Sequence, residues 1–351
     1  MLLSVLDQSP VAEGASGADA LRNTLDLARL ADALGYHRYW VAEHHGGPML
    51  ASSSPEALIG PIAAATEWIR VGSGGVMLPH YSPFKVAETF TVLAALYPGR
   101  IDLGIGRAAG TDPLTTFALQ RDRRQAAPDD FPQQLAELLA YLEDDLPADH
   151  PFQRLAPNLP GRPELPAVWL LGSSPQSAIW AGQLGLPYAF ADFINPGGEE
   201  IAALYRARFA EQRTSDGPGE LRVPAPRTAV AAWVLCAERD EEAQRLASSS
   251  RMTLALLRRG ELIPVPPPER ALAFLSREGG PPSDSLPGRR GIIGSPDTVR
   301  AGIEALAAGY GADEAIVVTI THDHSARRRS YELLAEAFEL EPRAPVATAD
   351  V

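Results

Sequence analysis

Apolar and polar positions along the chain form two alternating patterns. Residues 71–78 and 101–106 are short apolar runs interrupted by glycine, and both are too short for helices. Between them, residues 83–96 carry apolar side chains three and four positions apart, as an amphipathic helix requires. A strand, a helix and a second strand in this order predict a βαβ unit with parallel strands.

The same alternation continues through most of the chain. Strands are predicted to begin near residues 2, 39, 71, 101, 168, 188, 228 and 315, with helices between them. This number of repeats predicts an α/β fold of the (β/α)8 or TIM-barrel type, in a single domain over 1–340. A doubly wound open sheet is the alternative, because periodicity alone does not separate the two architectures.

Three stretches interrupt the alternation. Residues 111–166 contain charged, proline-punctuated sequence and one good helix at 132–142. The segment from about 258 to 291 is rich in proline and glycine, which predicts an irregular insert that serves either as a mobile lid or as a passive surface loop. The tail over 341–351 is predicted to be disordered.

Composition narrows the classes of partner. The chain has 351 residues and a net charge of −13, which argues against nucleic acid or an anionic membrane as partner. Cys236 is the only cysteine, so the chain has no disulfide framework. The first residues lack the pattern of a signal peptide, and no run is long enough to span a membrane. We therefore expect a cytoplasmic protein.

Histidines follow two of the predicted strands. His44 and His45 come after the strand that begins near 39, and His322 and His324 come after the last strand. One reading gives His44 a role in proton transfer, and another combines it with His322 and His324 in the metal site of a hydrolase. Structural histidines and a polar exit from the barrel explain the same residues.

Anion-binding groups follow two other strands. Arg107 stands at the end of a predicted strand, where its guanidinium can bind a phosphate. Residues 172–177 (GSSPQS) and 294–297 (GSPD) both have the sequence of a capped helix start, which exposes backbone amides to an anion. The local pattern leaves the choice between the two helix starts open.

Five segments in this order resemble the bacterial luciferase-like monooxygenase superfamily. They are LSVLDQSP, LGYHRYWVAEHH, RVGSGGVMLPHYSPFKVAE, YPGRIDLGIGRAAGTD and VWLLGSS. The chain is similar in particular to the single-chain, flavin-dependent members of the MsnO8-like group. The resemblance covers nearly the whole sequence and implies a (β/α)8 barrel that binds FMN.

The resemblance also implies roles for individual residues. His44 matches a catalytic histidine at the reactive side of the flavin, and Arg107 matches the arginine on its phosphate side. The glycine-rich third strand would support the ring, with a cis peptide between Gly74 and Gly75. The implied cofactor-binding residues are Gly74, Gly75, Val76, Arg107, Gly172, Ser173, Ser174 and Ser177; no metal ligand is implied.

The implied activity is that of a monooxygenase that uses reduced FMN and O2 to oxygenate a small organic substrate. Because the chain has no second nucleotide motif, reduced flavin would come from a separate reductase or by diffusion. The family implies a homodimer, with residues 55–66 and 83–96 as contacts. The alternatives are an F420-dependent oxidoreductase of the same superfamily, a flavin-binding protein without turnover, and a metal-dependent barrel hydrolase.

Overall fold

Eight parallel strands close into a barrel in the computed structural model, which describes residues 1–107, 112–124, 129–212, 221–278, 285–286 and 289–343. Both β1 and β7 pair with β10, so the sheet has no open edge at that point and the doubly wound alternative is wrong. Each strand begins within one residue of its predicted start. The barrel strands are β1 (Leu2–Asp7), β2 (Arg38–Val41), β3 (Arg70–Met77), β4 (Ile101–Gly106), β5 (Ala167–Gly172), β6 (Tyr188–Ala191), β7 (Thr228–Cys236) and β10 (Glu314–Val318).

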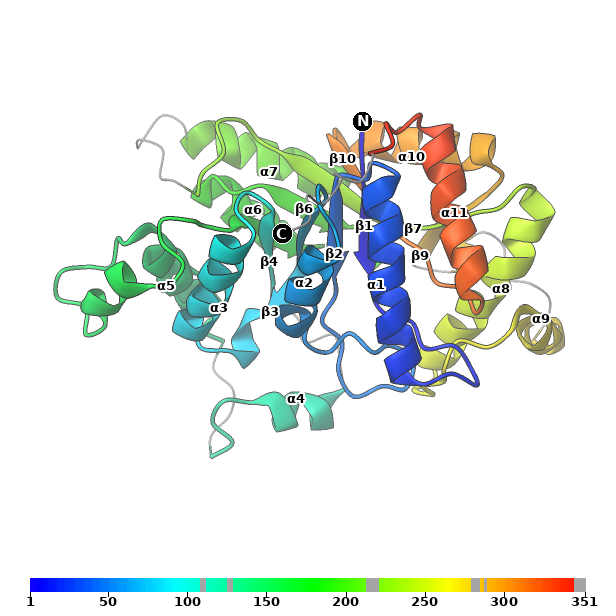
Figure 1. Ribbon diagram of the computed structural model, residues 1–351, viewed down its shortest axis with the longest axis horizontal. Helices are drawn as coiled ribbons and strands as arrows, with labels where there is room; N and C mark the ends of the chain where they lie inside the picture. The colour runs from blue at the N-terminus through cyan, green and yellow to red at the C-terminus, as the bar shows by residue number, and fades with distance from the viewer. Residues whose placement is uncertain (108–111, 125–128, 213–220, 279–284, 287–288, 344–351) are drawn as a thin grey trace, which may run out of the picture.

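Helices surround the barrel and cover its outer face (Figure 1). One of them, α4, lies apart from this ring, beyond the carboxyl end of β4 (Figure 1). The helices are α1 (Gly17–Ala33), α2 (Pro55–Ala64), α3 (Pro83–Leu96), α4 (Pro113–Leu119), α5 (Phe131–Glu143), α6 (Pro175–Leu184), α7 (Glu199–Gln212), α8 (Asp240–Leu257), α9 (Pro268–Arg277), α10 (Pro296–Tyr310) and α11 (His324–Ala337), with short 3-10 turns η1 (Leu78–His80) and η2 (Gln153–Asn158).

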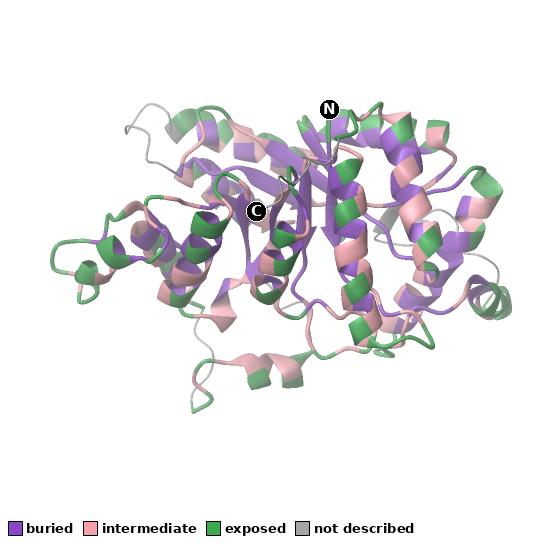
Figure 2. Ribbon diagram, in the orientation of Figure 1, coloured by how far each residue is buried: buried purple, intermediate pink, exposed green. Residues whose placement is uncertain are grey.

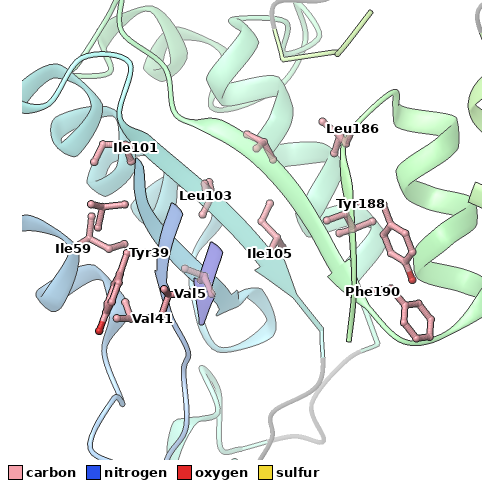
Figure 3. Close-up of a cluster of buried hydrophobic side chains, with 14 of the residues drawn as sticks. Val5, Tyr39, Val41, Ile59, Ile101, Leu103, Ile105, Leu186, Tyr188 and Phe190 are labelled. Carbon is pink, nitrogen blue, oxygen red and sulfur yellow. The ribbon is translucent and has the colours of Figure 1, made fainter. Parts of the chain in front are cut away.

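Alternating side chains of the strands form two separate cores. Val5, Tyr39 and Leu103 point outward and pack against the helices in one large cluster (Figure 3). Their neighbours Leu6 and Trp40 point inward and belong to a second cluster that fills the barrel. This alternation follows from the two-residue period of a strand. The helices that pack on the outer face of the barrel are buried on one side and exposed on the other (Figure 2).

The end of β7 carries a strand that the pattern did not predict. Strand β9 (Arg289–Gly294) pairs in parallel with residues from Trp233 to Cys236, beyond the point where the pairing of β7 with β10 ends. The sequence predicts a helix start at 294–297, directly after Ile292 and Ile293. Their β-branched side chains suit a strand, and the unpaired backbone of β7 offers a partner. A short strand β8 (Ser285–Leu286) pairs with β9 in antiparallel fashion.

The predicted irregular insert at about 258–291 is wrong for its central part. Helix α9 packs against α8 through Ala271 and Leu275, both buried. The prolines that suggested a loop stand at the start of this helix, where a backbone N–H has no partner within the helix and Pro268 loses no hydrogen bond. Part of the insert, 279–284 and 287–288, lies outside the described residues.

The predicted disordered tail at 341–351 is ordered in its first residues. The Arg343 backbone N–H donates to the carbonyl of Ala33 at 2.9 Å, at the end of α1. The Glu341 carbonyl lies so close to Gly35 that a Cβ at that position would be 2.2 Å from it. Residues 344–351 lie outside the described part of the chain.

Candidate active site

The carboxyl ends of β1 and β2 bring Gln8 and His44 together. Gln8 is buried, and its amide Nε2 lies 3.2 Å from Nε2 of the half-buried His44. The His44 backbone N–H donates to the Ser52 carbonyl at 2.8 Å, which fixes the position of the loop. Because the Gln8 amide donates to Nε2, the neutral imidazole carries its proton on Nδ1. In this tautomer the Nδ1–H of His44 is a hydrogen-bond donor.

Glu43, one residue earlier, links three elements around this loop. Its carboxylate accepts hydrogen bonds from the Met77 backbone N–H at 2.8 Å, from the Tyr81 hydroxyl at 3.0 Å and from His45 Nε2 at 2.8 Å. The side chain is completely buried. Burial, together with the charge of Glu43, raises the pKa of Tyr81, so this phenol stays protonated and donates. Glu43 was not among the predicted site residues, although an acidic residue at a strand end in EHH was a signal for it.

His45 contacts different residues from His44. It bonds to Glu43, and its ring lies 6.2 Å from the ring of His80 in an edge-to-face arrangement. Burial lowers the pKa of His80, so this ring is neutral. The two adjacent histidines thus have different environments, as expected for neighbouring positions at a strand end.

An ion pair closes the carboxyl end of β1 beside Gln8. Asp7 accepts hydrogen bonds from Arg327 Nη2 at 2.6 Å and from the Ser9 backbone N–H at 2.7 Å, and the Tyr39 hydroxyl bonds to its other oxygen. Burial opposes ionisation of Asp7, but the Arg327 guanidinium outweighs it and holds the pKa of this carboxyl below its usual value. This ion pair stabilises the rim, and among the described residues Arg327 Nη1 has no hydrogen-bond partner.

The glycine-rich strand β3 has the cis peptide between Gly74 and Gly75 that the resemblance implied. A Cβ on Gly74 would lie 2.5 Å from Leu6 Cδ1 inside the barrel, and one on Gly75 would lie 2.5 Å from the Gly104 carbonyl of β4. The backbone of β4 therefore requires glycine at position 75, whereas a side chain at position 74 would displace Leu6 inside the barrel. Contact with a flat ligand is a further prediction for the same positions.

Val76 differs from the two glycines before it. Its side chain is buried in the cluster between barrel and helices, together with Leu78 and Val86. The pairing of β3 with β4 shifts register between Gly74 and Val76, which turns the valine outward. Only the backbone of Val76 is therefore available to a cofactor at the barrel mouth.

Arg107 and helix α6 come together, although 68 residues separate Arg107 from Pro175 at the start of α6. The guanidinium carbon of Arg107 lies 6.0 Å from the centroid of the Trp180 ring on α6. Trp180 in turn packs against Phe131 of α5, with ring centroids 5.4 Å apart. An exposed cation is thereby held beside the helix that begins with the predicted serines.

The turn from β5 into α6 uses its serines for local structure. Ser174 is the N-cap and accepts from the Ser177 backbone N–H at 3.4 Å. The buried Ser177 hydroxyl donates to the Ser174 carbonyl at 2.8 Å and lies 3.0 Å from the Tyr188 hydroxyl. A Cβ on Gly172 would be 2.3 Å from Ser177 Oγ, so glycine is required there. The Ser173 carbonyl accepts from Asn195 Nδ2 at 3.0 Å.

The strand order arranges these groups along one arc of the barrel rim. His44 follows β2, the glycines lie in β3, Arg107 follows β4, and the capped turn follows β5, and these four strands are consecutive neighbours. The second capped turn, at Gly294–Ser295, follows β9 outside the barrel. Its Ser295 backbone N–H donates to the Asp240 carboxylate at 2.6 Å, so a carboxylate already occupies that position.

The three histidines of the metal-site hypothesis do not converge. His44 contacts Gln8, His322 Nε2 lies 3.2 Å from the Glu13 carbonyl, and His324 bonds to Asp26 at 2.8 Å. His324 is the first residue of α11, which Asp323 caps, so the motif is a helix start. Among the residues that the structure describes, no group of three or more His, Cys, Asp or Glu side chains could hold a metal ion.

A closed parallel barrel with polar side chains gathered at its carboxyl rim defines an enzyme of the (β/α)8-barrel class. The family model for luciferase-like monooxygenases matches residues 1–314. The chain is 40% identical to the luciferase-like monooxygenase of Escherichia coli (strain K12) over 342 residues, 96% of each chain. It is 39% identical to N-acetyl-S-alkylcysteine monooxygenase of Bacillus subtilis (strain 168), over 95% of this chain and 97% of the relative. The chain therefore belongs to the luciferase-like monooxygenase family.

Solved structures agree with this assignment. The structure of apo-MsnO8 is 45% identical in sequence and superposes with a TM-score of 0.86, over 97% of this chain and 99% of the other. The oxygenating constituent of 3,6-diketocamphane monooxygenase from Pseudomonas putida, solved with FMN, has a TM-score of 0.71 at 22% identity, which shows the shared fold alone. Within the described residues, every helix is too short or too polar to cross a membrane.

Proposed function

We propose that this protein is an FMN-dependent monooxygenase that uses reduced FMN and O2 to oxygenate a small organic substrate. Family membership supports monooxygenase chemistry. The observation that carries the choice of cofactor is the position of Arg107 beside Trp180 of α6, because the N-terminus of this helix follows β5, the neighbour of the strand that ends before Arg107. This combination suits the phosphate of FMN.

The donor set along the arc fits the two ends of this cofactor. Arg107 and the first amides of α6 would hold the phosphate. The half-exposed Gly74 in β3 presents backbone without a side chain, on which a flat ring would rest. Val76 would contribute through its backbone only, and Gly172, Ser173, Ser174 and Ser177 would shape the phosphate turn.

Bound reduced FMN would supply the reaction with O2, and the chain would supply orientation, exclusion of water and proton control. Gln8 fixes the His44 ring, so that Nδ1 would hold or deliver a proton near the reacting centre. Glu43 would act as a positioning residue, since it joins the loop that carries His44 to the end of β3 through the Met77 N–H. Glu43 needs no change of charge for this role, whereas His44 changes its charge by one when it takes up or delivers a proton.

Titration of the purified protein with oxidised FMN, reduced FMN and F420 tests the proposal. Reduced FMN should bind most tightly, and Arg107→Gln should weaken FMN binding by about tenfold or more while leaving riboflavin binding nearly unchanged. The matched control is Arg22→Gln, at an exposed site on α1. Failure to bind either redox state of FMN would contradict the proposal. Tighter binding of F420 would assign the chain to the alternative cofactor.

Oxygen uptake separates an enzyme from a flavin-binding protein without turnover. With a separate flavin reductase or chemically reduced FMN, candidate substrates should change the yield of hydrogen peroxide, because oxygenation competes with release of peroxide. N-acetylated S-alkylcysteines are a reasoned first set, since a relative named for them is 39% identical. Identical peroxide yields with every candidate would favour the non-catalytic alternative.

We further propose a homodimer through α2 and α3. Trp68, Val92 and Leu96 are large apolar side chains that are 45, 39 and 65% exposed around these helices. An exposed apolar patch of this kind favours association. Light scattering should report a dimer for the native chain and a monomer for Leu96→Asp. A monomeric native chain would contradict the proposal.

A further inference from the structure

A second polar region lies at the amino-terminal end of the barrel, opposite the candidate active site. A cavity of about 400 Å³ opens there between the starts of the strands. His37 precedes β2, Arg70 begins β3, Trp169 lies near the start of β5 and Arg227 precedes β7, and all four line the cavity with Arg222. The length of the strands separates this cavity from the carboxyl rim by roughly 20 Å.

The floor of the cavity is closed by buried groups. Arg38 bonds to Asp102 at 2.7 Å and to Glu314 at 2.8 Å. Its guanidinium carbon lies 4.6 Å from the centroid of the Trp169 ring, and that of Arg227 lies 5.6 Å from the same ring. Arg38 and Trp169 are almost fully buried, so a ligand in this cavity would lie against the end of the barrel and not inside it.

The titratable side chains that line the cavity are four arginines and one histidine. The Asp102 carboxylate, which lies behind the lining, neutralises Arg70 at 2.6 Å and also pairs with Arg38. In the part of the chain that the structure describes, the guanidinium groups of Arg222 and Arg227 have no carboxylate partner. Two cations in one concavity without a carboxylate partner among the described residues favour an anion there, even in a chain with a net charge of −13.

His37 lines the same cavity as these arginines. Its Nε2 is buried and has no hydrogen-bond partner among the described residues. Its backbone N–H donates to the Leu3 carbonyl at 2.8 Å, which holds the residue at the edge of the sheet. Burial and the charge of Arg38 lower the pKa of His37, so the ring is neutral near pH 7. Because this nitrogen is shielded from solvent, a ligand in the cavity meets the rest of the His37 side chain and not Nε2.

We propose that the cavity binds the phosphate group of a small organic phosphomonoester, through Arg222 and Arg227. A guanidinium matches a phosphate because its planar N–H groups form two parallel, charge-assisted hydrogen bonds. The volume exceeds that of a free phosphate, and Leu165 and Val223 offer an apolar wall for the rest of the ligand. The site is separate from the proposed FMN site and does not depend on it.

Calorimetric titration with inorganic phosphate and with AMP tests the proposal and separates its two sources. We expect AMP to bind more tightly than inorganic phosphate, because the apolar wall contacts the organic part. Arg222→Gln and Arg227→Gln should each weaken AMP binding by about tenfold or more, and the double variant should abolish it. Equal affinity for AMP and phosphate would overturn the organic ligand. AMP binding that is absent in the native chain would overturn the site.

Arg107→Gln is the matched control, since it removes a guanidinium at the other end of the barrel. It should leave AMP binding unchanged, and the double variant should leave FMN binding unchanged. Loss of AMP binding in Arg107→Gln alone would place the anion at the carboxyl rim and overturn the proposal. Failure of the FMN proposal would instead appear as absent FMN binding with AMP binding intact.

Arg227 also contacts Trp169, so its loss tests a structural role as well. Thermal unfolding of both single variants measures that role. A lowered midpoint for Arg227→Gln with unchanged AMP affinity would make this arginine a packing residue and contradict the proposal. Arg222 makes no such ring contact, and Arg222→Lys should retain part of the affinity because the charge stays while the forked geometry is lost.

Discussion

The two ends of the barrel differ in how their polar groups are held. At the amino end, Arg38 is fixed between the buried carboxylates of Asp102 and Glu314, and the Trp40 indole N–H also bonds to Asp102 at 3.0 Å. At the carboxyl end, half-buried His44 meets the neutral amide of Gln8. The amino end therefore carries a closed ion network, whereas the carboxyl end combines the buried Asp7–Arg327 ion pair with the neutral contact between Gln8 and His44.

The difference has a physical basis. A buried ion network is stable only when every charge has its partner, since each unpaired charge in a low-dielectric interior is costly. Such a network resists change and suits the closed end of the barrel. A neutral imidazole with an amide partner changes its hydrogen bonds at little cost, which suits an end where substrate and cofactor would arrive.

The largest expected effect on stability is that of removing Arg38 at the amino end of the barrel. Arg38→Met leaves Asp102 and Glu314 without their shared partner, and we expect a loss of about 3–5 kcal/mol in the free energy of unfolding. Urea denaturation measures it. Arg22→Met, at an exposed pair with Asp19, should change stability by less than about 1 kcal/mol. Equal effects of the two substitutions would remove the distinction between buried and exposed pairs.

Low pH should weaken the buried ion network at the amino end of the barrel in the native chain. Burial opposes ionisation of Asp102, but Arg38 and Arg70 outweigh it and hold the pKa of Asp102 below its usual value. The unfolded chain has a pKa of about 3.9 for aspartate. The ionised network therefore contributes its full stability above that pH and loses it as the pH falls through the lower pKa of the folded state.

The measurement is the urea midpoint at a series of pH values from 7 to 3. We expect a nearly constant midpoint down to about pH 4 and a steep fall below it. The fall should persist in 1 M NaCl, because salt screens exposed pairs far more than buried ones. A midpoint that does not change down to pH 3 would contradict the stabilising role of the network.

Loss of His44, at the carboxyl end, should lower activity strongly and stability little, the reverse of the effect expected for Arg38→Met. We expect His44→Gln to lower the rate of substrate oxygenation by about 10² or more, as for loss of a group that handles protons, and to change the free energy of unfolding by less than about 1 kcal/mol. Single-turnover oxygenation and urea denaturation of the same variant measure both. His45→Gln is the matched control, because it removes a neighbouring imidazole. This substitution should alter the free energy of unfolding through Glu43 and should lower the oxygenation rate less than His44→Gln does.

A methyl group on β3 tests whether the glycines serve the barrel itself. Gly74→Ala places a Cβ against Leu6, and we expect a loss of about 1–3 kcal/mol in the free energy of unfolding without FMN. Gly99→Ser, in a turn with open space but a positive φ, is a control for the effect of a side chain on backbone conformation alone. An unchanged stability for Gly74→Ala, with FMN binding lost, would assign Gly74 to the cofactor only.

Several local patterns predicted their structures well. The starts of the barrel strands were found to within one residue because a strand requires only a short apolar run, which is visible in the sequence. Strand β9 was missed because its backbone partner is the free edge of β7, which exists only after the barrel has closed. Helix α9 was missed because the prolines before it suggested a loop, although residues 268–277 have the apolar spacing of an amphipathic helix.

For the candidate site too, the sequence predicted some features and not others. The sequence marked His44, Arg107 and the serine turn, because each follows a strand end and carries suitable chemistry. It did not reveal that Arg107 rests on Trp180 of α6, that Gln8 orients His44, or that Glu43 joins β2 to β3. It also gave no sign of the cavity at the amino end, whose lining comes from six separate strand starts.

By itself, the sequence determined the eight-strand repeat, the family and the residue types at the strand ends, since these depend on short-range periodicity and local motifs. The tertiary structure alone decided which charges meet. Arg38 and Glu314 are 276 positions apart and still form one buried pair, because barrel closure brings β10 beside β1. Pairing at such separation depends on the closed geometry of the whole sheet, and no local pattern encodes it.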